Sequence, residues 1–302
     1  MDTFTDFYPR EIKLRNLERL LEEPHFSFRE VDLCTMPLHA FIEGADTVFH
    51  MAAQAGVRGS FGESFDHYVR NNVIATQRLL DAMVAHPEAS LVYASSSSVY
   101  GNAQRMPTPE SCDRHPVSPY GMTKVATEEL AGVYSRVHGI PTVGLRYFTA
   151  YGPRQRPDMA FSRFISRALS DEELVVNGDG QQARDFTYVD DVVDATIAAA
   201  RLREPGARVY NVGGGEPVTI NEVLGLLSRI VERPLRVRNG SPQQGDARRT
   251  SADAGSAERE LGFMAKHALE DGMRAQVAWV LAVDRSASRR LDDHGVRELR
   301  AA

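Results

Sequence analysis

Short apolar runs alternate with longer amphipathic stretches through the first half of the chain. Each short run is continuously apolar rather than strictly alternating, which is typical of strands buried on both faces of a parallel sheet. The strands are expected at Phe26–Val31, Thr47–His50, Ser90–Tyr93 and Thr142–Arg146. Helical patterns lie between them, notably over Phe65–Ala85 and Pro119–Val137. This alternation predicts an α/β fold with a doubly wound parallel sheet.

The second half of the chain is more mixed. Strands are expected at Leu174–Val176, Asp185–Val189 and Arg208–Val212, and helices over Asp190–Leu202 and from Thr219 to about Val231. Thr219 and Glu222 have the spacing of a capping box, which marks a helix start. We therefore expect one domain over residues 1–150, to which elements of about 185–212 return. A smaller mixed α/β domain mainly over 151–283 and a polar tail over 284–302 complete the chain.

Composition excludes several classes of protein. Hydrophobic residues make up 42% and charged residues 25% of the 302 positions, so a core of useful size is available. The net charge is −6 without a Lys/Arg cluster, so no nucleic-acid partner is expected. Cys34 and Cys112 form no disulfide framework. The start lacks the pattern of a signal peptide and no apolar run is membrane-length, so we expect a cytoplasmic protein without membrane contact.

Tyr120 and Lys124 are the first candidates for chemistry. Their spacing of four places both side chains on one helix face. Ser118-Pro119 is a suitable N-cap and first helical position. The helix dipole and the neighbouring ammonium should both favour the phenolate, so we expect a lowered pKa for Tyr120, which suits a general base. Chance would produce such a pair about 0.1 times in a chain with this Tyr and Lys content, so context must strengthen the signal.

Four consecutive serines supply that context. Ser95–Ser98 follow the apolar run L-V-Y-A, which puts hydroxyls at the carboxyl end of a predicted strand. Ligands of open α/β sheets bind at that edge. A polar linker is the alternative, but it fits poorly because V-Y-G follows directly.

The segments A-S-S-S-S-V-Y-G, S-P-Y-G-M-T-K and L-R-Y-F-T-A-Y-G-P-R together resemble the extended short-chain dehydrogenase/reductases that modify nucleotide sugars. The resemblance runs from Asp2 to about Phe263. It implies a Rossmann-like fold, NAD as cofactor bound by the first domain, and a nucleotide sugar bound by the smaller one. It also implies catalytic roles for Tyr120 as base, Lys124 as its partner, and Ser96 as the hydroxyl that hydrogen-bonds the reacting sugar oxygen. In the family's epimerases, C4 of the sugar gives hydride to NAD⁺ and receives it back on the other face of a 4-keto sugar.

The residue types at the two positions that follow the catalytic serine differ between the branches of this family. Dehydratases and decarboxylases carry acids there, whereas this chain carries Ser97 and Ser98. A hydroxyl cannot replace a carboxylic acid as proton donor at neutral pH, which favours epimerisation. Thr149 and R-Q-R-P-D-M-A-F around Arg156 resemble UDP-glucuronate 4-epimerases, so Arg156 is a candidate partner for a sugar carboxylate. A surface ion pair of Arg156, a UDP-glucose 4-epimerase and a dehydratase or decarboxylase remain alternatives.

The same resemblance implies the remaining contacts. For the substrate, these are Ser97, Ser98, Thr149, Arg156, Arg184, Asp246 and Arg248. For NAD, they are Asp2, Asp32, Leu33, Met51, Ala52, Ala53, Gln54, Asn72, Ala94, Ser95, Tyr120, Lys124 and Tyr147. No metal is expected, and Gly213-Gly214-Gly215 is interpreted as a turn because G-K-S/T does not follow it.

The glycine-rich loop that opens the chain in this family is missing from the sequence. No G-x-x-G-x-x-G occurs, and Asp2 matches the acidic residue that ends the family's second strand. One hypothesis is therefore that the chain is an incomplete version of a working enzyme, without the first strand, the first helix and most of the second strand. Another is a genuine short form that binds no NAD tightly and serves as an inactive partner or scaffold. The intact catalytic residues favour the first. The resemblance also implies a homodimer formed through the helices at Phe65–Ala85 and Pro119–Val137.

Overall fold

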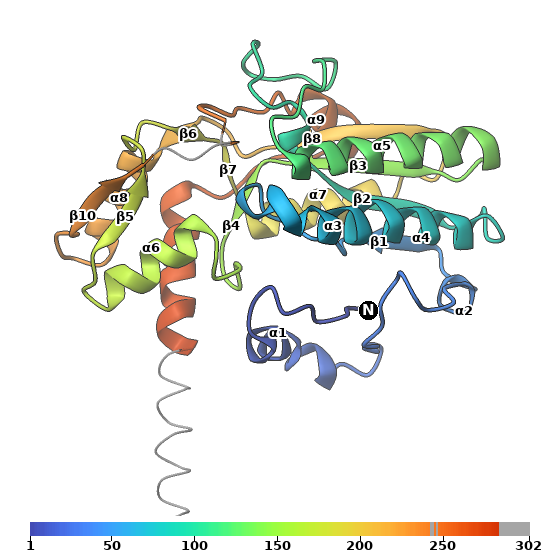
Figure 1. Ribbon diagram of the computed structural model, residues 1–302, viewed down its shortest axis with the longest axis horizontal. Helices are drawn as coiled ribbons and strands as arrows, with labels where there is room; N and C mark the ends of the chain where they lie inside the picture. The colour runs from blue at the N-terminus through green and yellow to red at the C-terminus, as the bar shows by residue number, and fades with distance from the viewer. Residues whose placement is uncertain (242–244, 246, 284–302) are drawn as a thin grey trace, which may run out of the picture.

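A parallel sheet of four strands organises the larger half of the molecule (Figure 1). The computed structural model describes residues 1–241, 245 and 247–283, so the predicted tail 284–302 lies outside the described residues. The sheet has the order β1-β2-β3-β8, with every pair parallel. Its strands are β1 (Thr47–His50), β2 (Ser90–Ser96), β3 (Thr142–Tyr147) and β8 (Ala207–Val212). The predicted α/β parallel sheet is confirmed.

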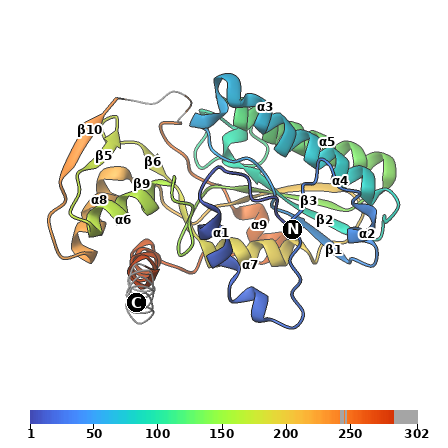
Figure 2. The same ribbon diagram turned by 60° about the horizontal axis from the view of Figure 1, so that its bottom comes forward.

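Helices cover both faces of this sheet (Figures 1 and 2). One face carries α2 (His39–Ile42), α3 (Phe65–Tyr68), α4 (Ala75–Met83) and α5 (Pro119–His138), and the other carries α7 (Val189–Ala199) and α9 (Gly255–Leu261). Strand β2 shows why its apolar run is continuous. Leu91 and Tyr93 pack beneath α4 and α5, whereas Val92 packs among the residues of the opposite face. Alternate side chains of one strand therefore fill two separate cores.

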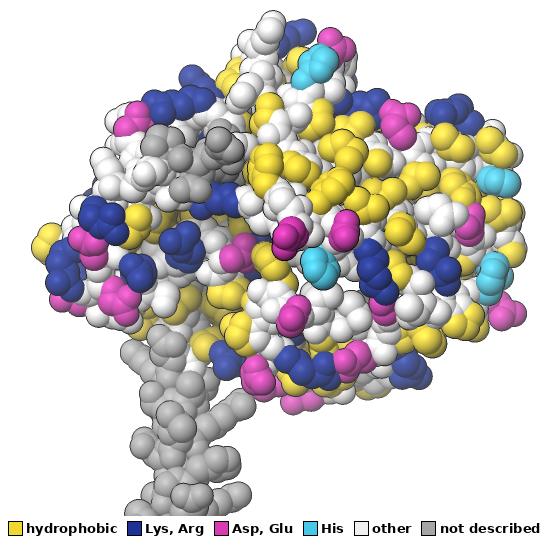
Figure 3. All heavy atoms as spheres, viewed as in Figure 1, with side chains coloured by type: hydrophobic (Ala, Val, Ile, Leu, Met, Phe, Trp, Pro, Cys, Tyr) yellow, Lys and Arg dark blue, Asp and Glu magenta, His cyan; other side chains and the backbone are white. Residues whose placement is uncertain are grey.

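The outer surface of α4 and α5 is unusually apolar for solvent-facing helices. Val84, Met122, Val133 and Val137 are exposed there, and Figure 3 shows apolar side chains gathered over these two helices. An apolar patch of this kind often marks a surface that another molecule covers.

A smaller lobe follows the third sheet strand and has its own core. Its strands are β5 (Leu174–Asn177) parallel to β10 (Val237–Gly240), and β6 (Ala183–Arg184) antiparallel to β9 (Val218–Thr219). Its helices are α6 (Ala160–Leu169) and α8 (Ile220–Ile230), while β4 (Thr149–Tyr151) pairs with β7 (Phe186–Tyr188) beside the sheet; residues 269–283 are also helical. The predicted capping box is confirmed, because Thr219 and Glu222 exchange both hydrogen bonds.

Two elements predicted in the first half of the chain differ from the structure. Phe26–Val31 is not a strand: among the described residues it makes only one β-bridge, from Glu30 to Asp2, since no longer strand lies beside it. The predicted helix Phe65–Ala85 is interrupted by a π-helical stretch, Val69–Ile74. The N-terminal segment instead contains α1 (Arg10–Leu17) and reaches back toward the carboxyl ends of the sheet strands.

The predicted strand Asp185–Val189 is shorter in the structure, where β7 spans Phe186–Tyr188 and Asp185 lies just outside it. Asp185 is fully buried and accepts hydrogen bonds from the backbone N–H groups of Gly214 and Ala252, at 2.6 and 3.0 Å. These bonds tie the Gly213–Gly215 turn to β7 and leave β6 and β7 as separate short strands. None of the helices within the described ranges combines the length and apolar character that a membrane crossing requires.

Candidate active site

A cavity of about 900 Å³ opens at the carboxyl ends of β1, β2 and β3. Both lobes and the N-terminal segment line it, in agreement with the rule that parallel sheets bind ligands at this edge. Most residues proposed from the sequence meet here. They are Asp2, Asp32, Leu33, Met51, Ala52, Ala53, Gln54, Ala94, Ser95, Ser96, Ser97, Ser98, Tyr120, Lys124, Tyr147, Thr149, Arg156 and Arg184.

Helix α5 brings Tyr120 and Lys124 into this cavity. The helix begins as the sequence predicts, with the Ser118 hydroxyl accepting from the Gly121 N–H at 3.1 Å and Pro119 in the first turn. The Lys124 ammonium lies 6.0 Å from the centre of the Tyr120 ring and donates to the Ala94 carbonyl at 2.8 Å. The helix therefore presents phenol and amine from adjacent turns, both beside the end of β2.

The turn after β2 fits closely against the start of α5. A Cβ atom on Gly121 would lie 2.5 Å from the Ser98 carbonyl oxygen, so only glycine allows this approach. Ser96 ends the strand, is 9% exposed, and its hydroxyl accepts from the Ser98 N–H at 3.1 Å. The Ser96 side chain also lies close enough to the Tyr120 phenol to act on its pKa. Ser96, Tyr120 and Lys124 thus face the same part of the cavity.

Burial governs the protonation of this group. Desolvation lowers the pKa of Lys124 to about 8, and the carboxylate of Glu128 opposes part of that change. Desolvation raises the pKa of Tyr120, while the Ser96 side chain opposes the rise. The expectation of a lowered Tyr120 pKa is therefore wrong for this structure, because burial outweighs the helix start and the ammonium 6.0 Å from the ring.

Arg156 lies in the cavity wall and is paired within its own loop. Its guanidinium donates to both carboxylate oxygens of Asp158, each at 2.9 Å, and lies 5.4 Å from the centre of the Phe7 ring. Burial lowers the pKa of Arg156, but the Asp158 hydrogen bond and charge reverse this and leave a net rise. Arg156 therefore lines the cavity and is ion-paired at the same time, and its role toward a sugar carboxylate stays a prediction.

The second substrate region behaves differently. Arg184 lines the cavity, but Arg248 lies outside it and forms a bidentate ion pair with Asp179, at 2.8 and 3.1 Å. Asp246 lies outside the described residues.

The opposite end of the cavity holds several of the residues assigned to NAD, while the family's glycine-rich loop is missing from the sequence. Asp32 accepts hydrogen bonds from Arg70 at 2.6 Å and from the Cys34 N–H at 2.8 Å, which lower its pKa against the effect of desolvation. Ala52 and Ala53 are small, so a ligand can approach the backbone after β1. With Tyr120 and Lys124 at the other end, the described residues fit a dinucleotide laid along the strand ends.

Asn72 supports this site without entering the cavity. Its side chain accepts from the Gln54 N–H at 2.7 Å and donates to the Gln54 carbonyl at 3.0 Å. It also donates to the Thr123 hydroxyl at 2.9 Å. Asn72 therefore fixes the loop after β1 to helix α5.

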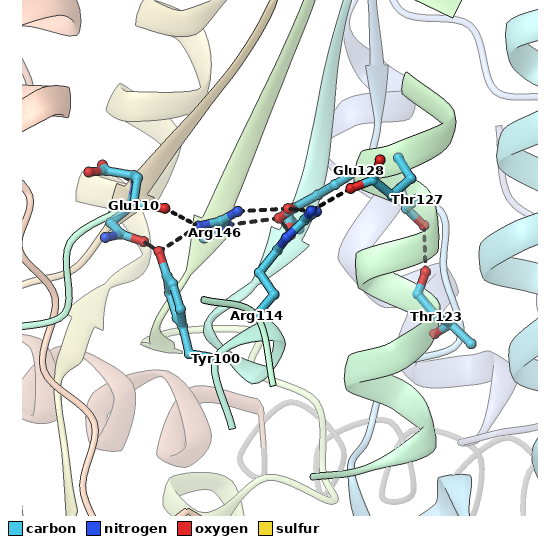
Figure 4. Close-up of polar contacts among 10 residues, drawn as sticks. Tyr100, Glu110, Arg114, Thr123, Thr127, Glu128 and Arg146 are labelled. Atoms are coloured by element: carbon cyan, nitrogen blue, oxygen red, sulfur yellow. Dashed lines mark hydrogen bonds and ion pairs between the residues drawn. The ribbon is translucent and has the colours of Figure 1, made fainter. Parts of the chain in front are cut away.

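A buried ion-pair network connects α5 to β3 (Figure 4). Arg146, on β3, donates to both carboxylate oxygens of Glu128 at 2.8 Å, and Arg114 donates to the same carboxylate at 3.2 Å. Another nitrogen of Arg146 donates to the Tyr100 hydroxyl at 2.7 Å and to the Glu110 carbonyl at 3.1 Å. The Glu128 and Arg146 side chains are only 2% and 6% exposed. Strand β3 and the loop segments that carry Tyr100, Glu110 and Arg114 are thereby tied to α5.

Several residues that line the cavity were not predicted from the sequence. Phe7 and Tyr8 come from the N-terminal segment, Arg58 follows the loop after β1, and Asn177 and Gln182 come from the smaller lobe. The positions of these residues depend on how distant segments pack, so no local spacing reveals them. Arg58 sits in Q-A-G-V-R, directly after residues that the sequence had already marked, and was the most accessible of these to prediction.

Comparison with known proteins agrees with this geometry. The model of the NAD dependent epimerase/dehydratase family matches residues 8–213. An uncharacterised UDP-glucose epimerase, YtcB of Bacillus subtilis, is 40% identical, with 93% of this chain and 88% of that protein covered. A UDP-glucuronate 4-epimerase of Thermodesulfobacterium geofontis is 34% identical, with 92% and 87% covered.

A solved structure extends the comparison to three dimensions. The crystal structure of UDP-glucuronic acid 4-epimerase from Bacillus cereus, in complex with UDP-glucuronic acid and NAD, superposes with a TM-score of 0.90. It is 37% identical, and the match covers 93% of this chain and 90% of that one.

Proposed function

The chain belongs to the NAD dependent epimerase/dehydratase family, and from this premise we propose that it inverts C4 of UDP-glucuronate to give UDP-galacturonate. The enzyme is an NAD-dependent UDP-sugar 4-epimerase that works through a transient 4-keto sugar. The observation that carries the proposal is the meeting of Ser96, Tyr120 and Lys124 in one cavity, with serines where an acid would be needed for elimination or decarboxylation.

Each of these residues has a defined task. Tyr120 takes the proton of the sugar 4-hydroxyl and later returns it, while the Ser96 hydroxyl bonds the same oxygen and holds it beside the phenol. Lys124 keeps a positive charge near the phenol, which opposes in part the preference that burial gives to the neutral form. NAD, when bound, supplies the hydride acceptor and donor for C4. Hydride leaves and returns within one cycle, so the reaction needs no second substrate.

We propose that the two lobes divide the binding. The domain over residues 1–150, with the returning elements of about 185–212, holds NAD through Asp2, Asp32, Leu33, Met51–Gln54, Ala94, Ser95 and Tyr147. The domain mainly over 151–283 holds the UDP-sugar through Arg184, with Ser97, Ser98, Thr149 and Arg156 around the sugar. The cavity that these residues share supports this division. We place Asn72 behind the NAD contacts and leave Arg248 outside the first contacts, because neither lines the cavity.

UDP-glucose is the second candidate substrate. The relative with 40% identity is named a UDP-glucose epimerase, and Arg156 is already paired with Asp158 in this structure. A neutral sugar would leave that ion pair in place, whereas a glucuronate carboxylate would compete for the guanidinium.

The function is tested by incubating the protein with NAD and UDP-glucuronate and following the products by NMR. We expect UDP-galacturonate to accumulate toward equilibrium without net consumption of NAD. Release of carbon dioxide or formation of a pentose would reject epimerisation. If the protein interconverts UDP-glucose and UDP-galactose but does not act on UDP-glucuronate, UDP-glucuronate is rejected as the substrate and 4-epimerisation is retained.

Replacing Arg156 separates the two sugars. In the R156A variant, kcat/KM for UDP-glucuronate is expected to fall about 10- to 100-fold, since a charge-assisted hydrogen bond to a carboxylate contributes about 1.5–3 kcal/mol. The same variant should retain activity with UDP-glucose within about threefold of the unaltered protein. Steady-state kinetics with both substrates measure this. An equal loss for both sugars would show that Arg156 does not recognise the carboxylate.

We also propose that the protein forms a homodimer through the apolar outer surface of α4 and α5 (Figure 3). Val133 and Val137 lie one turn apart on α5 and are 44% and 68% exposed. The double variant V133E/V137E should be monomeric, because burying two carboxylates in such an interface is costly. Light scattering coupled to gel filtration would measure the mass of each variant. The control is V193E, which places a carboxylate on α7 at the other face of the sheet and should leave the dimer intact. A V133E/V137E dimer would contradict this interface.

A further inference from the structure

Glu128 occupies the point where the elements of the proposed active site meet. It lies one turn beyond Lys124 and two turns beyond Tyr120 on α5. Besides Arg146 and Arg114, its carboxylate accepts from the Ser95 hydroxyl at 2.5 Å. Ser95 stands between Ala94, whose carbonyl accepts from Lys124, and Ser96. One buried carboxylate on α5 therefore holds the short strand segment on which the lysine and the serine both depend.

The third element enters through the sheet. Arg146 is the register partner of Ser95 in the β2–β3 ladder, and it grips the same carboxylate with two hydrogen bonds. A shift of α5 along the sheet would break the contacts of Glu128 to both strands at once. The bonds of Glu128 thus fix the register between α5 and the end of β2.

We propose that Glu128 is a positioning residue of the epimerase: through Ser95 it sets where Ser96 and the Ala94 carbonyl stand, and its charge faces Lys124. This inference rests on the proposed function, since it assigns Glu128 a role in the same reaction. Glu128 touches neither substrate nor cofactor in this scheme. Its effect reaches the chemistry through the groups it holds.

The charged surroundings of Lys124 support the second part of the proposal. On its own helix, Tyr120 and Glu128 face it. His50 on β1 is the titratable neighbour on the other side, and burial lowers its pKa to about 3, so it stays neutral. Strand β2 offers only the Ala94 carbonyl, and Arg146 on β3 acts through Glu128. Among the described residues, Glu128 is therefore the anion that raises the pKa of Lys124.

A lysine titration tests this part without any turnover. The chain has three lysines, Lys13, Lys124 and Lys266, so a protein labelled with ¹³Cε-lysine gives three resonances, and the K124M variant identifies that of Lys124. In the E128Q variant the pKa of Lys124 should fall by at least about half a unit, because the positive charges of Arg146 and Arg114 lose their counter-charge. E129Q is the matched control: Glu129 is the next residue, is 55% exposed and pairs with Arg114 alone. The E129Q substitution should leave the pKa of Lys124 unchanged.

Kinetics test the positioning part. In E128Q, kcat should fall about tenfold or more with KM for UDP-glucuronate within about twofold, because misplaced reacting groups slow the chemical step. S95A removes the hydroxyl that connects Glu128 to the strand and leaves every charge in place, and since Ser95 is also a proposed NAD contact, its kcat is measured at saturating NAD. It should lower kcat about threefold with the Lys124 titration unmoved. S95A remains decisive if E128Q does not fold.

Two results would overturn the proposal. One is a folded E128Q protein whose Lys124 titrates as in the unaltered protein, and the other is an S95A protein with unaltered kcat. If the unaltered protein turns over neither UDP-glucuronate nor UDP-glucose, the proposed function fails instead, and the lysine titration still decides whether Glu128 controls the charge of Lys124.

Discussion

The Y120F variant is expected to lose about 10³-fold in kcat for the epimerisation of UDP-glucuronate. The phenol oxygen is the atom that takes and returns the proton of the 4-hydroxyl, and removing a general acid–base group costs about 10²–10⁴-fold. Binding should be retained, because the ring keeps its place in the wall of the cavity. The measurement is kcat by NMR or coupled assay, with dissociation constants for NAD and UDP from calorimetry.

Tyr68 offers a matched control for this prediction. Its ring lies 6.2 Å from that of Tyr120 in an edge-on contact, and its hydroxyl donates to the Gly56 carbonyl at 2.8 Å. Y68F therefore removes a neighbouring phenol oxygen that has no part in the proposed chemistry, and kcat should stay within about threefold. A Y120F enzyme that keeps more than a tenth of the activity would show that another group carries the proton.

The R146M variant is expected to lose about 3–5 kcal/mol of the free energy of unfolding. Methionine fills much of the same space, but it leaves the Glu128 carboxylate buried without its bidentate partner, and breaking a buried ion pair on one side has this cost. The Tyr100 hydroxyl also loses a partner. Urea unfolding followed by circular dichroism measures the loss.

Arg114 provides the comparison for Arg146. It contacts the same carboxylate at a longer 3.2 Å, is 31% exposed and is shared with Glu129. R114M should therefore lose only about 1 kcal/mol, as expected for a partly exposed pair. Equal losses in R114M and R146M would mean that burial does not set the strength of this network.

The elements that the sequence predicts well are those decided locally. The start of α5 needs only Ser118 and Pro119, and the capping box of α8 needs only Thr219 and Glu222. The parallel strands at Thr47–His50 and Thr142–Tyr147 follow from continuous apolar runs. The clustering of Ser96, Tyr120 and Lys124 could be anticipated because strand ends and helix starts share one edge of such a sheet.

The elements that it predicts poorly are those decided by distant partners. Phe26–Val31 is apolar enough for a strand, but Asp2 is its single β-bridge partner among the described residues. The pKa of Tyr120 follows from burial by segments that are remote in sequence, so the helix start and Lys124 gave the wrong sign. Arg248 matched a motif but pairs with Asp179, a partner that no spacing rule connects to it.

Strand β1 has a consequence for the behaviour of the protein in solution. Within the described part of the chain it pairs on one side alone, with β2, and Phe49 and Met51 at its end are 46% and 43% exposed. An unpaired strand edge with apolar side chains can pair with a strand of another protein molecule and so promote aggregation. The colloidal stability of this protein therefore depends on its concentration and on what covers that edge.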